Sequence, residues 1–305
     1  MQPTLRFSSV LLVFAFLIGT TTPDQTVRSE DPYIEIEALH SNGGLLEGYQ
    51  AYIKTPICES ETCYNVEISF VWDLIGRFQK FDTLSGAGLT KLDHIPFTEA
   101  DYQKLAQLLK DAKSPLADYK KEELVRDTRS SEIDGFTGAT ALEIKESVIS
   151  GGVYSCYTLW HIAHGSLVDS LRLMTYNQLD TALVEKIVNI QDQEMNYFLI
   201  QHFSEQDYTK YLPQVLKTFE NGSGYYAKQA IEQMPATVFA VPIAQDFFAA
   251  YFERLNYFAQ VALLKKLSSK ALSSSMTQTL QKYLEERNST KTQLIRDLLG
   301  YKNKP

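Results

Sequence analysis

A chain of 305 residues with 44% hydrophobic content can bury a substantial core, and its length suggests roughly two domains. Its 37 acidic and 29 basic residues give a formal net charge of -8 at pH 7. Nucleic acids and anionic membrane surfaces favour basic patches, so this balance argues against both as partners.

Residues 1–22 have the pattern of an export signal. Arg6 precedes an apolar run at residues 10–18, and small or polar residues follow it. A run this short cannot cross the hydrocarbon core of a bilayer, which takes about 20 residues. We therefore expect export with cleavage, to the periplasm or the outer face of the cytoplasmic membrane. A retained N-terminal anchor is the alternative.

Two segments of the mature chain alternate apolar and polar residues. Ile34, Ile36 and Ala38 alternate within residues 33–39. Residues 65–72 repeat the pattern, and an apolar stretch at residues 49–53 lies between them. Alternation with period two predicts half-buried strands, with some antiparallel pairing.

Cys58 and Cys63 lie between these strand signals, with four residues between them. In an exported protein such a pair most often forms a structural disulfide, which is our prediction. A redox-active pair is the sharper alternative, and no second cysteine pair is present to complete a metal site.

A helix is predicted after Thr98, the expected N-cap, because Tyr102, Leu105 and Leu109 recur at helical spacing. Residues 113–130 are polar and charged, which predicts a solvated connection. Its basic side chains are candidates to neutralise a nearby phosphate, and they are Lys120, Lys121, Arg126 and Arg129.

Residues 134–140 read Asp-Gly-Phe-Thr-Gly-Ala-Thr, and a helical pattern with Ile144 and Val148 follows them. The two glycines permit tight turns and close backbone approach. Thr140 would then lie near a helix start, where free N–H groups and the positive end of the dipole suit a phosphate.

These seven residues resemble the flavinylation motif Asp-x-x-(Ser/Thr)-Gly-Ala-(Thr/Ser) of extracytoplasmic FMN-binding domains, such as the flavin subunits of the Rnf and sodium-pumping NADH:quinone oxidoreductase complexes. In that family a flavin transferase joins FMN through its phosphate to the last threonine. The resemblance implies that Thr140 is the acceptor, with Asp134, Thr137, Gly138 and Ala139 as recognition positions. The alternative is a Gly-rich turn with a threonine N-cap.

A further helix is predicted from Val153. Its apolar stripe places Cys156 and Trp160 in the core, with Cys156 acting as a small apolar residue. The opposite face carries Tyr157, His161 and His164, which either contact the flavin and supply protons to it or form an ordinary amphipathic face.

Strand signals are absent from residue 166 onward. Similar helices begin near residues 196, 224, 256 and 290, a spacing that predicts HEAT-like hairpins stacked as a short solenoid. Their aromatic stripes indicate packing, and any surplus would be a docking surface for another protein.

The fold prediction is therefore an α+β FMN-binding-like domain at residues 30–165, followed by an all-α HEAT-like domain at residues 166–305. The resemblance implies extracytoplasmic electron transfer with a flavin transferase and a membrane-associated redox protein as partners; no catalytic residue is assigned. A non-enzymatic interaction module and a thiol-disulfide protein using Cys58 and Cys63 are the alternatives. Motifs typical of P-loop enzymes, Rossmann dehydrogenases, serine hydrolases and zinc proteases are absent.

Overall fold

The computed structural model describes residues 32–59, 62–84, 88–91, 94–126, 139–140, 142–220, 222, 224–285 and 289–301. The predicted export signal lies outside the described residues, as do Asp134, Thr137 and Gly138 of the motif. Within the described ranges, no helix has the length and apolar character needed to cross a membrane.

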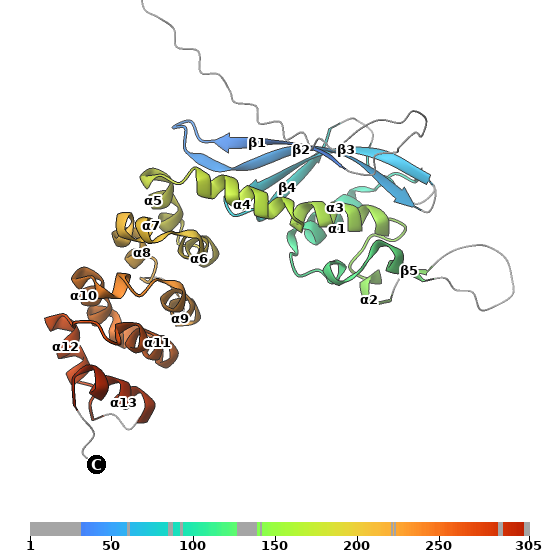
Figure 1. Ribbon diagram of the computed structural model, residues 1–305. Coiled ribbons are helices and arrows are strands. Elements are labelled where there is room, and N and C mark those ends of the chain that lie inside the picture. The colour runs from blue at the N-terminus through green and yellow to red at the C-terminus, as the bar shows by residue number, and fades with distance from the viewer. Residues whose placement is uncertain are drawn as a thin grey trace, which may run out of the picture.

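A four-stranded antiparallel sheet forms the N-terminal part of the structure (Figure 1). Its strands pair in chain order as β1 (Tyr33–His40), β2 (Leu46–Glu59), β3 (Thr62–Asp73) and β4 (Phe78–Thr83). The two alternating segments predicted as strands are therefore confirmed as β1 and β3. Each pairs antiparallel with β2, which confirms the predicted antiparallel pairing.

One face of this sheet is the core face. The β2–β3 register sets Tyr49 opposite Trp72, Ala51 opposite Phe70 and Ile53 opposite Ile68, and all six side chains are fully buried. The helices α1 (Glu99–Lys110), α3 (Val153–His164) and α4 (Leu167–Asn177) cover this face (Figure 1). Period-two alternation places apolar side chains on that face and polar ones on the other.

The strand β4 was not predicted from the sequence, and the reason is physical. The β3–β4 register shifts between Val71 and Trp72, so the strict alternation of buried and exposed residues is lost. Phe78 is buried, but the two residues after it are both exposed. An irregular pattern of this kind gives no period-two signal.

The helix α1 begins where the sequence predicted, with Thr98 as its N-cap in a reciprocal capping box with Asp101. The Asp101 carboxylate accepts hydrogen bonds from the Thr98 backbone (2.8 Å) and hydroxyl (2.7 Å), and it pairs with Lys91 at 2.7 Å. Partial burial raises the pKa of Asp101, but the bonds from Lys91 and Thr98 outweigh it and lower the pKa to about 2.

Replacing Asp101 with asparagine is therefore expected to lower the free energy of unfolding by about 1 kcal/mol at pH 7. The folded-state pKa lies below the unfolded value, so this stability is present above pH 4 and is lost as the pH falls toward 2. Urea titrations between pH 2 and 7 measure this dependence. Glu99→Gln, an exposed first-turn change outside the capping box, is the control; equal effects of the two substitutions would contradict the assignment.

Residues 113–126 were predicted as part of a solvated connection, and most of their described side chains are exposed. They form the short 3-10 helices η2 (Pro115–Asp118) and η3 (Lys121–Glu123) and the two-residue strand β5 (Val125–Arg126). Leu116 and Leu124 are fully buried, which the sequence did not indicate because isolated leucines among charged residues produce no periodic signal.

From α4 onward the described chain is helical, in two layers that extend away from the sheet (Figure 1). Alternate helices pack: α6 on α9, α9 on α11 and α11 on α13 in one layer, and α5 on α8, α8 on α10 and α10 on α12 in the other. The bounds are α5 Thr181–Ile190, α6 Gln193–His202, α7 Glu205–Lys210, α8 Leu212–Lys217, α9 Gly224–Gln233, α10 Pro242–Tyr251, α11 Tyr257–Leu267, α12 Ser274–Gln281 and α13 Ser289–Leu298, with 3-10 turns η4 Val238–Ala240 and η5 Phe252–Arg254. The coarse prediction of a sheet-containing part followed by a helical part is confirmed.

Candidate functional site

Thr140 lies in β6 (Ala139–Thr140), which pairs antiparallel with β5. The register sets the Thr140 backbone opposite Val125 and the Ala139 backbone opposite Arg126. The helix after it, α2 (Leu142–Lys145), is a single turn followed by further turns. The longer helix expected after Thr140 was therefore wrong, and one turn has too small a dipole to hold a phosphate by itself. Ile144 and Val148 are nevertheless buried, as their spacing indicated.

The predicted polar face of α3 carries its three half-buried rings toward the chain around η2. The His161 Nε2 lies 3.2 Å from the Leu116 carbonyl, and the His164 Nε2 lies 2.8 Å from the Leu109 carbonyl. A carbonyl oxygen only accepts, so each Nε2 carries a hydrogen and each Nδ1 keeps its lone pair. Trp160 likewise donates to the Asp111 carbonyl at 2.9 Å. These bonds fix the α3 rings against the segment from α1 to η2.

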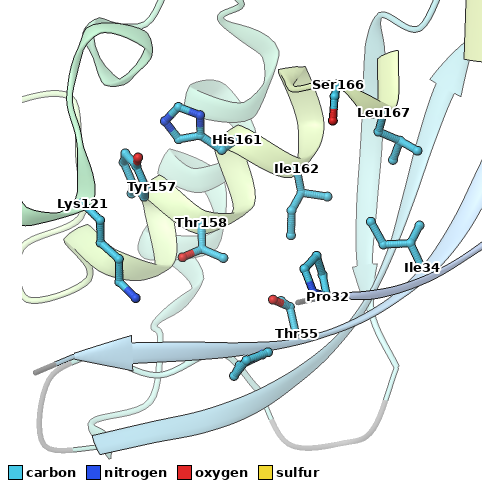
Figure 2. A pocket seen from close by; sticks show the side chains of 11 residues that line it. Pro32, Ile34, Thr55, Lys121, Tyr157, Thr158, His161, Ile162, Ser166 and Leu167 are labelled. Carbon is cyan, nitrogen blue, oxygen red and sulfur yellow. The ribbon is translucent and has the colours of Figure 1, made fainter. Parts of the chain in front are cut away.

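A pocket of about 320 Å³ lies between α3 and the strands β1 and β2 (Figure 2). The helix contributes Tyr157, Thr158 and His161 among others, and η3 contributes Lys121 beside Tyr157. The described residues that line it are Pro32, Ile34, Thr55, Pro56, Lys121, Tyr157, Thr158, His161, Ile162, Ser166 and Leu167. An apolar floor with a few polar groups is typical of small-molecule sites.

The ionisable rings of this pocket are uncharged at neutral pH. Burial lowers the pKa of His161, and the bond to the Leu116 carbonyl opposes this effect only in part. Burial raises the pKa of Tyr157, and the nearby charges of Glu122 and Glu123 raise it further. The pocket therefore offers a neutral imidazole acceptor and a neutral phenol.

Lys121 supplies a positive charge to this lining, and none of the described lining residues carries a carboxylate. Among the described residues, no hydrogen bond or ion pair joins the Lys121 ammonium to a partner. The adjacent Glu123 carboxylate instead accepts from the Lys120 backbone at 2.9 Å. A cation in a concave site that no described side chain pairs with favours an anionic or electron-rich ligand.

The β5–β6 ladder limits the distance between this pocket and Thr140. Lys121 precedes Val125 by four residues, which span at most about 14 Å of extended chain. Antiparallel partners lie about 5 Å apart, so the Thr140 backbone is within about 20 Å of Lys121.

The sequence-predicted residues divide into two groups at this pocket. Tyr157 and His161 line it, whereas His164 does not and packs on Trp160, with ring centroids 4.8 Å apart. Lys121 was one of four basic residues considered as candidates to neutralise a phosphate. Its position in the pocket lining comes from the fold and could not be read from the sequence. Ile34 carried only a strand signal, and Pro32 and Thr55 lay outside the predicted strand segments.

Cys58 and Cys63 are opposite one another in the β2–β3 register. Antiparallel partners have Cα atoms about 4.5–5.5 Å apart, which falls within the range of disulfides. The predicted disulfide is compatible with this backbone and stays a prediction. Cys156, by contrast, is fully buried as predicted, and burial raises the pKa of its thiol to about 12.

Among the described residues, no group of three or more His, Cys, Asp or Glu side chains is placed to hold a metal ion. Comparisons with models of protein families, with curated proteins and with solved structures find no match for this chain.

Proposed function

We propose that this chain is an exported flavoprotein that carries FMN covalently on Thr140 and transfers electrons outside the cytoplasm. The proposal is supported by the flavinylation-like motif together with a pocket whose lining residue Lys121 lies no more than about 20 Å from the Thr140 backbone. A flavin transferase and a membrane-associated redox protein are the partners that this function requires.

The lining of the pocket fits a flavin ring. The apolar side chains of Ile34 and Ile162 lie on opposite walls, one on β1 and the other on α3. Tyr157, His161 and Lys121 provide a phenol, an imidazole and an ammonium group to the polar edges of a planar heterocycle. When bound, FMN supplies one- and two-electron chemistry, and the protein's part is to orient the ring and tune its potential.

The covalent attachment can be tested by co-expressing the chain with a flavin transferase. We expect the intact mass of the mature protein to increase by that of an FMN phosphoester, and the denatured band to fluoresce in a gel. Thr140→Ala should lose both signals completely, because the acceptor hydroxyl is gone. Mass spectrometry of the same sample reports cleavage of the export signal and the Cys58–Cys63 disulfide.

Two control variants isolate the acceptor. Thr140→Ser should keep the flavin, since the motif allows either hydroxyl at this position. Thr158→Ala removes a hydroxyl that lines the pocket and should also stay flavinylated. A Thr140→Ala protein that still fluoresces after denaturation would contradict the assigned acceptor.

The second candidate function is an interaction module in which the helical part binds a protein. We infer that this part is a HEAT-like solenoid, because alternate helices pack in two layers. Tyr225 is 70% exposed at the start of α9, and Phe258 is 62% exposed at the start of α11. A Cβ on Gly224 would lie 2.4 Å from the Asn256 amide nitrogen, so these two helix starts are neighbours. A chain that stays free of flavin in the co-expression experiment would favour this second function.

A further inference from the structure

The position of Lys121 in the pocket follows from the short turn η3, which lies against α3. Lys121 opens η3, and its backbone lies close enough to the Tyr157 phenol to oppose the rise in the pKa of that phenol. Leu124, which ends the turn, is fully buried and anchors the segment. The backbone is therefore held against α3, and the side chain extends beside Tyr157 along the pocket (Figure 2).

The described lining carries charge of one sign only, and the Glu122 and Glu123 carboxylates, which lie close enough to raise the pKa of Tyr157, are outside it. The described lining contains the Lys121 ammonium and no carboxylate, and His161 is neutral at pH 7 because burial lowers its pKa. A full positive charge at the edge of a partly apolar site interacts more strongly than it would in water. The site therefore stabilises a ligand more when that ligand carries negative charge.

A flavin ring acquires such a charge on reduction. The oxidised ring is neutral; it takes up two electrons from the redox partner and one proton from solvent, which leaves one negative charge on the reduced ring. Charge near the ring nitrogens is one of the means by which a protein tunes a flavin.

We propose that Lys121 binds the negative charge of the reduced flavin ring and thereby raises its reduction potential. This inference rests on the proposed attachment of FMN to Thr140. Lys121 acts here as a tuning residue: the electrons come from the partner protein, and the lysine keeps its proton throughout.

The affinity of the flavin for sulfite reports how well the site stabilises the same negative charge on the ring, and its measurement needs no electron transfer from a partner. The sulfur lone pair of sulfite forms a bond to a ring nitrogen of the oxidised flavin, and the displaced electron pair leaves a negative charge on the ring. We expect Lys121→Gln to raise the sulfite dissociation constant roughly tenfold, and Lys121→Glu to raise it further. The reduction potential should fall in the same order, and Lys121→Arg should stay near the wild-type values.

Lys120→Gln is the matched control, because it removes the same charge one residue away, from an exposed side chain outside the lining. Thermal unfolding of each variant shows whether the fold is kept. If flavin is attached but Lys121→Gln and Lys120→Gln have equal sulfite affinities, the tuning role is overturned while the proposed function stands. If the wild-type chain gains no flavin mass, both are overturned.

Discussion

Replacing Trp72 with alanine is expected to lower the free energy of unfolding by about 3–5 kcal/mol, a large share of the stability of a typical domain. The Trp72 side chain is fully buried on β3. Its ring packs edge-on against the Phe70 ring, with the two ring centroids 5.5 Å apart. The substitution leaves a cavity on the sheet's core face near the end of β3, which the neighbouring side chains can fill only in part.

Trp72 also completes the end of α3. Its Nε1 donates to the Ala163 carbonyl at 2.9 Å, in the last turn of the helix that carries Tyr157 and His161. The last four carbonyls of a helix have no partner within it, so this bond satisfies a buried acceptor. Urea-induced unfolding followed by circular dichroism measures the loss.

Trp72→Phe separates the two contributions. It keeps an aromatic ring in the core but removes the donor, so we expect a smaller loss of about 1–3 kcal/mol. If Trp72→Phe costs as much as Trp72→Ala, the hydrogen bond to α3 dominates and ring packing is secondary. A cost below about 1 kcal/mol for the alanine variant would contradict the core assignment.

The sequence predicted best where a regular element has one buried face. Alternation in residues 65–72 identified the core side chains of β3, and helical spacing identified those of α1 and α3. The helix starts in the C-terminal part were also close to the observed ones, because the N-caps Asp192 and Asn256 precede periodic apolar residues. These signals are local and need no knowledge of the tertiary contacts.

The candidate site could be predicted only in part, because it depends on contacts between distant segments. Helical phase placed Tyr157, His161 and His164 on one face, but it gave no information on what lies opposite each ring. His161 faces the pocket while His164 packs under the end of α1, where it bonds to Leu109. Lys121 lines the pocket only because the fold brings η3, α3 and β2 together. No spacing rule in the sequence connects these three segments.

Contacts of two kinds join the sheet to the helical part. Arg77, in the turn after β3, pairs at 2.7 Å with Asp192 and at 3.1 Å with Glu194 at the start of α6. Glu194 is exposed, and solvent-accessible pairs contribute about 0–1 kcal/mol. The second contact is a buried chain of hydroxyls between β2 and α4. Unsatisfied buried polar groups cost more than exposed pairs contribute, so the hydroxyl chain should dominate the junction.

Thr175→Val is therefore expected to lower the free energy of unfolding by about 2–4 kcal/mol. The fully buried Thr175 hydroxyl donates to the Leu74 carbonyl at 2.6 Å, so its oxygen accepts from the Tyr49 hydroxyl at 2.9 Å. Valine has nearly the same shape but leaves both partners buried without a bond.

Tyr49→Phe removes only the outer member of the chain and should cost about 1 kcal/mol, since Thr175 keeps its bond to Leu74. In the double variant the unpaired phenol no longer exists, so its cost should fall short of the sum of the two single costs by about 0.5–3 kcal/mol. Urea unfolding of all four proteins closes this cycle, with Arg77→Met as the comparison for the exposed contact. Strict additivity would show that the two hydroxyls act independently. A smaller loss for Thr175→Val than for Arg77→Met would move the main coupling between sheet and helices to the ionic contact at the surface.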